Sequence, residues 1–149
     1  MPKLLKPNQA MSVIQALTII RRKFAESGNR ARIPLRKRGS FNAVASEQGV
    51  RVSNLGNQPT LPWAVFQEAV CLLIRNGGRA KTGNAMSYKL GQPGLPLDSI
   101  EGHIAYVVYG KREGETVFRR IAPVAAILIW AGICTPSRSA LILRNNVTE

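Results

Sequence analysis

The residues of this sequence whose type and spacing best indicate a function are its lysines and arginines. Between residues 21 and 38 there are eight of them against a single acid, Glu26. They are Arg21, Arg22, Lys23, Arg30, Arg32, Arg36, Lys37 and Arg38. Lysine and arginine neutralise phosphates, which raises affinity for a nucleic acid without reading its sequence. The segment is therefore predicted to be an arm that follows a phosphate backbone.

The whole chain shares this bias. Its 149 residues include 21 Lys and Arg against 8 Asp and Glu, a net charge of +13. Residues 1–61 hold eleven basic and two acidic residues (+9), and residues 62–149 hold ten and six (+4). Such a chain repels itself, so a polyanionic partner is the natural explanation. Nucleic acid is the leading candidate, followed by ribosomal surfaces and anionic lipid heads.

A second stretch of interest is TVFRRIAPVAAILIWAGICTPSRSALILR, residues 116–144, where an Arg pair precedes an apolar run. Its meaning depends on how residues 98–121 fold. In the favoured alternative, Asp98 or Ser99 caps a helix through Tyr109, and Thr116 caps a second helix that continues to residue 130 or 131.

The other alternative is a hairpin. HIAYVVYG and ETVFRRI would be its strands, and the helix would begin at Pro123, which suits a first helical turn. Strand propensity supports this arrangement, as does the cost of about 3 kcal/mol for a proline inside a helix.

The end of the stretch favours helices. WAGICTPSRSALIL places Gly132 after an apolar helix, then a polar turn, then a short apolar strand from Ala140 to Leu143. Winged-helix domains end in this way, and residues 62–144 resemble the winged-helix domains at the N-terminus of Mrr-type restriction endonucleases. The resemblance rests on an apolar helix that ends at Gly77-Gly78, and on TVFRRIAPVAAILIWAGI before a small basic β-ribbon.

This resemblance implies binding to duplex DNA, with the helix that starts near Thr116 in the major groove and the ribbon, or wing, beside it. Arginine bonds bidentately to O6 and N7 of guanine, so Arg119 and Arg120 are the candidates for reading bases. Phosphate contacts are expected from the preceding turn and from the wing: Lys111, Arg112, Arg138 and Arg144.

Hydrophobic periodicity predicts the remaining helices. Val13, Leu17, Ile20 and Phe24 recur at helical spacing, so residues 9–26 are predicted to form an amphipathic helix. The clearest helix in the chain is predicted for residues 62–76, and a short helix is expected near residues 84–90.

Alternating apolar residues predict the strands. A turn is expected at residues 47–49, between apolar residues on either side: Phe41, Val44, Val50 and Val52. This pattern indicates a hairpin. RIPLR, residues 32–36, is a candidate third strand that Pro34 confines to an edge. The expected fold class is α+β. An N-terminal helix and small sheet (residues 1–61) would pack on a winged-helix-like domain (residues 62–149) as one compact unit.

Catalytic, metal and cofactor sites are not expected. A restriction-type nuclease needs a carboxylate pair followed closely by Lys to hold Mg²⁺, and the spacing of Asp98, Glu101 and Lys111 fits no such pattern. Two Cys and one His are too few for a zinc site. Neither a GxxxxGK[ST] nor a GxGxxG motif occurs. A small nuclease or nucleic-acid-modifying subunit remains the second hypothesis, and an RNA- or ribosome-associated adaptor the third.

The apolar run does not predict a membrane anchor. It holds thirteen residues, Ile121 to Ile133, interrupted by Pro123 and Gly132, whereas a span needs about 20. The first ten residues, MPKLLKPNQA, lack the apolar run of a secretory signal. We therefore expect a cytoplasmic protein with a role in regulation, such as transcription regulation, or in chromosome association. A homodimer is compatible with the sequence.

Overall fold

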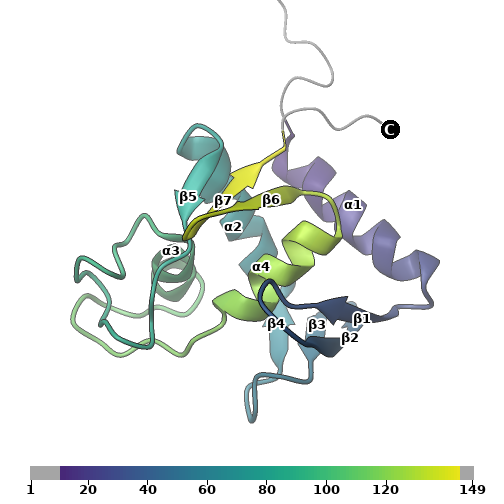
Figure 1. The fold of residues 1–149 in the computed structure, drawn as a ribbon, viewed down its shortest axis with the longest axis horizontal. Coiled ribbons are helices and arrows are strands. Elements are labelled where there is room, and N and C mark those ends of the chain that lie inside the picture. Colours follow the sequence, from purple (N-terminus) through teal and green to yellow (C-terminus); the bar gives the residue numbers. More distant parts are fainter. Residues whose placement is uncertain (1–10, 145–149) are drawn as a thin grey trace, which may run out of the picture.

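The computed structural model describes residues 11–144, and this part of the chain holds four helices and two antiparallel sheets (Figure 1). The predicted α+β class is confirmed. In chain order the elements are α1 (Val13–Glu26), β1 (Arg30–Pro34), β2 (Ser40–Ser46), β3 (Gly49–Val52), β4 (Thr60–Pro62), α2 (Trp63–Arg75), β5 (Arg79–Lys81), α3 (Ile100–Val107), α4 (Ile121–Trp130), β6 (Cys134–Ser137) and β7 (Ala140–Leu143).

The predicted N-terminal helix is confirmed as α1. The Ser12 hydroxyl caps it by accepting the Gln15 N–H at 3.0 Å, and the helix ends just before Gly28, whose φ of +71° suits a helix end. Its buried residues are Ala16, Ile20 and Phe24. These residues belong to the main hydrophobic cluster, in which α1 contacts α2 as well as strands β1 and β2.

The first sheet is a meander of order β1-β2-β3-β4. The predicted hairpin is confirmed, because β2 and β3 pair around a turn with Ser46 opposite Gly49. The predicted third strand is present as the edge strand β1, but it spans Arg30–Pro34 and not the predicted residues 32–36. Side chains alternate along β1 and β2 between the core and solvent.

The second sheet has the order β5-β7-β6. Its central strand is the predicted apolar strand β7, which pairs with β5 on one side and with β6 on the other. Helix α2 directly precedes β5 and ends at Arg75 with Asn76 as its C-cap residue, followed by Gly77 and Gly78 with φ of +78° and +98°. The short helix expected near residues 84–90 is absent; the Asn84 side chain closes a turn there by accepting the N–H groups of Met86 and Ser87.

Residues 98–121 adopt a mixture of the two alternatives. Ser99 caps α3, as expected, by accepting the Gly102 N–H at 3.1 Å. The following helix, α4, does not begin at Thr116 but at Ile121, and residues 108–120 form neither helix nor strand. Glu101 explains this start, because its Oε2 accepts the backbone N–H groups of Arg120 and Ile121 at 2.9 and 3.0 Å. A carboxylate from another helix thus satisfies donors that a helix start leaves without partners.

Pro123 fits this start as well. It is the third residue of α4, where the N–H that proline lacks would have no intrahelical acceptor. The cost of a proline inside a longer helix is therefore avoided.

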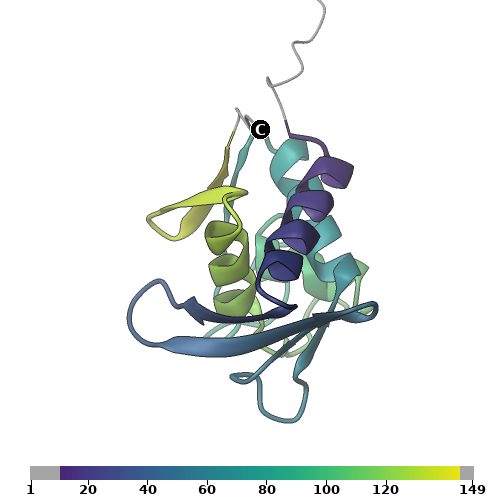
Figure 2. The ribbon, with the colours of Figure 1, turned by 90° about the vertical axis from the view of Figure 1, so that its right-hand side faces the viewer.

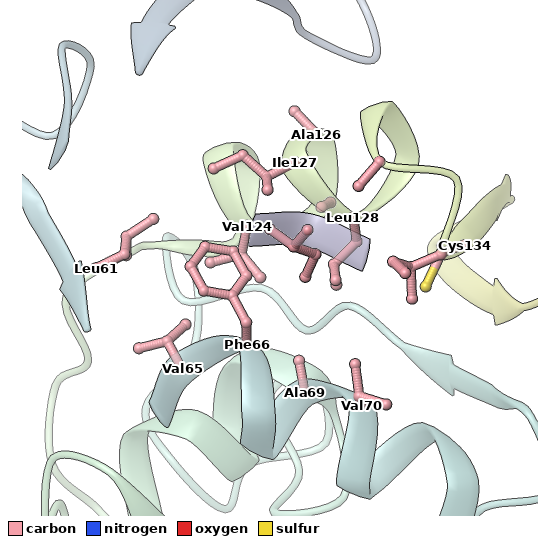
Figure 3. Packing of buried hydrophobic residues seen from close by; sticks show 14 of the residues in the cluster. Leu61, Val65, Phe66, Ala69, Val70, Val124, Ala126, Ile127, Leu128 and Cys134 are labelled. Atoms are coloured by element: carbon pink, nitrogen blue, oxygen red, sulfur yellow. The ribbon is translucent and has the colours of Figure 1, made fainter. Parts of the chain in front are cut away.

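Helix α4 lies in the centre of the molecule. Figure 3 shows Val124 of α4 next to Phe66 of α2, and Leu128 of α4 on the side of Ala69 and Val70 of α2. On another side, the rings of Phe24 and Trp130 lie 4.8 Å apart. One hydrophobic cluster therefore contains residues from both the 1–61 and the 62–149 segments. No helix among residues 11–144 is long and apolar enough to cross a membrane.

Candidate nucleic-acid interface

The basic side chains have almost no acidic partners inside the molecule. Within residues 11–144, the one pair closer than 4.0 Å is His103 Nε2 and Glu68 Oε1, at 2.9 Å. The arginines and lysines of this part are therefore not neutralised by neighbouring carboxylates. The described surface therefore carries a large positive charge that its own carboxylates do not balance.

The N-terminal cluster, continuous in sequence, divides into three surfaces in space. The first lies on α1. The Arg21 guanidinium lies 4.2 Å from the centre of the Trp63 ring, and the Lys23 ammonium 5.3 Å from that of Trp130. Cations attract the face of an aromatic ring, so these two side chains shield the tryptophans. Arg22, between them, is exposed.

The second surface is the outer face of the first sheet. Arg30 is opposite Val44, and Val44 is opposite Arg51, so these three exposed residues share one face. Arg32 lies on the same face, where its Nε donates to the Ser40 hydroxyl at 2.8 Å. Arg51 was not among the contacts expected from the sequence, although its place between the apolar Val50 and Val52 indicates an outward side chain.

The third surface is the tip of the β1–β2 hairpin, where Arg36, Lys37 and Arg38 follow one another. Leu35 N–H donates to the Gly39 carbonyl at 2.9 Å and closes the loop. This tip lies beside the turn of the β6–β7 hairpin, because Arg36 Nη2 donates to the Ser137 carbonyl at 2.8 Å. Figure 2 shows the two hairpins projecting from the same side of the molecule.

The β6–β7 turn adds a further exposed cation, Arg138. Arg79 of β5 contacts this turn, because its Nη1 donates to the Ser137 hydroxyl at 3.2 Å. Thr82 holds it from the side by donating its backbone N–H to the Ser139 carbonyl at 3.0 Å. The two adjacent tips, defined by Arg36, Lys37, Arg38 and Arg138, are named here the paired tips.

A pocket of about 550 Å³ lies between the two hairpins, named here the inter-hairpin pocket. Its floor is apolar and comes from Leu35 and the first turns of α4, at Ile121, Ala122 and Ala125. Its rim carries the cations of the β1–β2 tip together with Arg119. None of its lining residues is acidic.

The structure separates the two arginines that were expected to read bases. Arg119 is exposed and lines the inter-hairpin pocket. Arg120 is only 6% exposed; its Nη2 donates to Gln58 Oε1 at 2.7 Å, and its guanidinium lies 3.6 Å from the centre of the Tyr109 ring. Burial lowers the pKa of Arg120, while the neighbouring Tyr109 and Glu101 act in the opposite direction. Arg120 is therefore buried and held by contacts within the protein, which does not fit the expected base-reading role.

Helix α4 cannot present base-reading side chains either. It contains no charged residue, and most of its side chains are buried. The expectation of a groove-reading helix that begins at Thr116 and carries the Arg pair is corrected by this placement. Arg119 precedes the helix instead of lying on its exposed face.

The other predicted phosphate contacts lie outside the inter-hairpin pocket. Lys111 and Arg112 belong to the loop of residues 108–120, where the Arg112 backbone N–H donates to Glu115 Oε1 at 2.7 Å. Arg144 follows β7 at the end away from the β6–β7 turn, and its Nη1 lies beside Gly132.

The buried titratable groups have structural contacts. Burial raises the pKa of Glu101 to about 7, against the effect of the two N–H groups that its carboxylate accepts. Burial also raises the pKa of Cys134 to about 12, so this thiol is not a ready nucleophile. Among residues 11–144, no group of three or more His, Cys, Asp or Glu side chains is placed to hold a metal ion.

Comparisons with protein-family models, with curated proteins and with solved structures found no match for this chain.

Proposed function

We propose that the protein binds duplex DNA through its phosphate backbone, with the paired tips as the main contact. One observation carries the proposal. The two hairpins bring four cations together, and the Arg36–Ser137 hydrogen bond holds them side by side without an acidic residue in the pocket between them. Phosphate contacts supply most of the affinity of non-specific DNA binding, so such a cluster suits this partner.

The order of the elements supports this proposal. From α2 onward the chain runs helix, strand, helix, helix and then a two-stranded hairpin, with the first strand pairing with the last. In the winged-helix resemblance the β6–β7 hairpin takes the place of the wing. Arg138 at its turn then has the role of a phosphate contact.

The burial of α4 favours binding through phosphates over binding that reads base edges. In the resemblance, α4 takes the place of the helix that enters the groove, but here most of its side chains are buried and it packs against α2, β1 and β6. Base edges are read by side chains in the grooves, whereas phosphate contacts carry no sequence information. We therefore propose binding with low sequence specificity, which fits chromosome association better than recognition of one target sequence.

The outer face of the first sheet extends the proposed contact. Arg32 bonds to Ser40, the first residue after the β1–β2 loop, so this face adjoins the paired tips. Arg30 and Arg51 continue the row of cations across the sheet. A duplex placed against the tips would meet these arginines next.

The experiment is a salt titration of binding to a fluorescein-labelled blunt 20-base-pair duplex, followed by anisotropy. The variant Arg36→Ala/Lys37→Ala/Arg38→Ala removes three cations from the paired tips. A charge-matched control, Arg75→Ala/Lys81→Ala/Lys89→Ala, removes three exposed cations that are not among the expected DNA contacts. We expect the tip variant to lose at least tenfold in affinity and the slope of log K against log salt to fall by about 2.7, or 0.9 per lost contact.

Equal losses in the two variants would contradict the proposal, because net charge alone would then explain the binding. The same titration with an RNA duplex of the same sequence tests the adaptor hypothesis. Tighter binding to RNA than to DNA at every salt concentration would favour that hypothesis over ours.

A further inference from the structure

The inter-hairpin pocket has a cavity and an apolar floor, neither of which is needed to bind a phosphate backbone. A backbone contact requires exposed cations, which the paired tips supply without a cavity. The pocket nevertheless has a volume of about 550 Å³ and an apolar floor. This volume lies in the range of small-molecule sites, which are largely apolar with a few placed polar groups.

The lining indicates the chemistry of an occupant. The floor, formed by Leu35, Ile121, Ala122 and Ala125, offers an apolar surface without a charge. Arg119 stands beside this floor together with the cations of the β1–β2 tip. A ligand that satisfies both parts has an apolar body and an attached anion.

Asn84 adds a directional contact. Its Oδ1 accepts the backbone N–H groups of Met86 and Ser87, both at 3.1 Å, which fixes the side chain. Asn84 lines the pocket, and within residues 11–144 both hydrogen bonds of its side chain are made by Oδ1, which leaves Nδ2 available as a donor. A fixed amide donor suits the acceptor atoms on the edge of a nucleobase.

A single nucleotide has these features, with a flat base and a phosphate. A nucleotide inside a duplex does not present its base in this way, because the base is stacked and paired. Leaving the stack costs a few kcal/mol, and the cost is smallest where the nucleotide is already unpaired. Ends, overhangs and gaps are therefore the sources of such a ligand.

We propose that the inter-hairpin pocket binds one unpaired nucleotide of a nucleic acid, with its base on the α4 floor and its phosphate at Arg119 and the β1–β2 tip. This inference rests on the proposed function, since the paired tips would hold the neighbouring backbone. It makes the protein a binder that prefers DNA with an unpaired end to an uninterrupted duplex.

The first test uses isolated ligands and a variant that fills the pocket. Ala122 is half-buried on the floor, and replacing it with leucine keeps a good helix former. The matched control is Ala64→Leu, at an exposed position of α2 outside the pocket. Binding of 2′-deoxyadenosine 5′-monophosphate, deoxyadenosine and inorganic phosphate is measured by isothermal titration calorimetry with the full chain.

We expect the monophosphate to bind at least tenfold more tightly than either part alone. Ala122→Leu should weaken it at least tenfold, and Ala64→Leu should leave it unchanged. If Ala122→Leu unfolds the chain, Arg119→Gln replaces it, since Arg119 is exposed and its loss should weaken the monophosphate and not the nucleoside. Equal affinity for monophosphate and phosphate would overturn the proposal, because the pocket would then be an anion site only.

The second test separates this inference from the proposed function. The labelled duplex is compared with the same duplex carrying a three-nucleotide 3′ overhang, and again with a 5′ overhang. Tighter binding of an overhang that Ala122→Leu abolishes supports the inference. Equal binding of all three DNAs overturns the pocket inference and leaves backbone binding in place. Monophosphate binding without any duplex binding would overturn the proposed function and leave the pocket in place.

Discussion

Arg36 of the β1–β2 loop donates a hydrogen bond to the backbone carbonyl of Ser137 over 2.8 Å, although the two residues are 101 positions apart. This contact joins the N-terminal sheet to the β6–β7 hairpin at the point where both are most basic. Because of this contact, the three cations of residues 36–38 lie beside Arg138, although the two sites are far apart in the sequence. The geometry of the proposed DNA contact depends on it.

The first prediction concerns this contact. Arg36→Lys keeps the charge but replaces the guanidinium fork with a single ammonium group, which holds the Ser137 carbonyl less well. We expect a several-fold loss in affinity for the blunt duplex at unchanged net charge. Arg38→Lys is the control, because no hydrogen bond of the Arg38 side chain within residues 11–144 would be lost. Faster amide exchange at Leu35 in the Arg36 variant alone would show that the loop has loosened.

The second prediction separates Arg119 from Arg120. Arg120 is buried and bonded to Gln58, so Arg120→Ala removes a charged hydrogen bond and should lower the free energy of unfolding by about 2 kcal/mol. Arg119→Ala should leave that free energy within about 0.5 kcal/mol, as for most surface substitutions. Urea unfolding measures both, and duplex affinity should fall in the Arg119 variant. The assignment would be wrong if the two variants were equally destabilised.

The sequence predicted the elements whose signals are local. The spacing of Ile20 and Phe24, the alternation in β2 and β3, and the glycines after α2 each act within a few residues, and these elements appear as expected. The start of α4 was not predictable in this way. It is set by Glu101, whose carboxylate lies 19 and 20 positions before the N–H groups that it accepts.

The candidate site, too, was only partly predictable from local sequence signals. Its cations were recognised by composition, but the tip that carries three of them was not predicted, because Arg36 was placed in a strand of residues 32–36 whereas β1 ends at Pro34. Their division into three surfaces depends on strand register and on the Trp63 and Trp130 contacts, which composition does not contain. The inter-hairpin pocket was missed for the same reason, since its walls come from four separate segments.

The third prediction concerns pH and Glu101. Its pKa is raised from 4.5 to about 7 in the folded chain, so the folded state holds a proton over a pH range in which the unfolded state has lost it. The contribution of Glu101 to stability should therefore fall as the pH rises from about 4.5 to 7. A shift of this size corresponds to about 3 kcal/mol at most.

Glu101→Gln removes this titration and keeps an oxygen that can accept the two N–H groups. We expect the difference in unfolding free energy between wild type and variant to change with pH between 5 and 7.5, as measured by guanidinium unfolding. A difference that is constant over this range would show that Glu101 does not titrate there.

The fourth prediction concerns the central position of α4. Leu128 is fully buried between α2 and the N-terminal elements, so Leu128→Ala should leave a cavity and cost about 2–5 kcal/mol. Because residues of both segments share this cluster, tryptophan fluorescence and far-UV circular dichroism should report one coincident transition in wild type and variant. Two separated transitions would show that the segments unfold independently.

The last prediction concerns the outer face of the first sheet. Arg30, Arg32 and Arg51 share this face, and the proposed duplex would meet them after the paired tips. We expect Arg30→Ala/Arg32→Ala/Arg51→Ala to lower the salt slope for the 20-base-pair duplex by up to about 2.7, at 0.9 per contact. A shorter duplex that reaches only the paired tips should show a smaller change, because it would not extend over the sheet. If the triple variant lowered the slope equally for both lengths, the sheet face would belong to the same contact as the tips; if it changed neither, the duplex would follow another path.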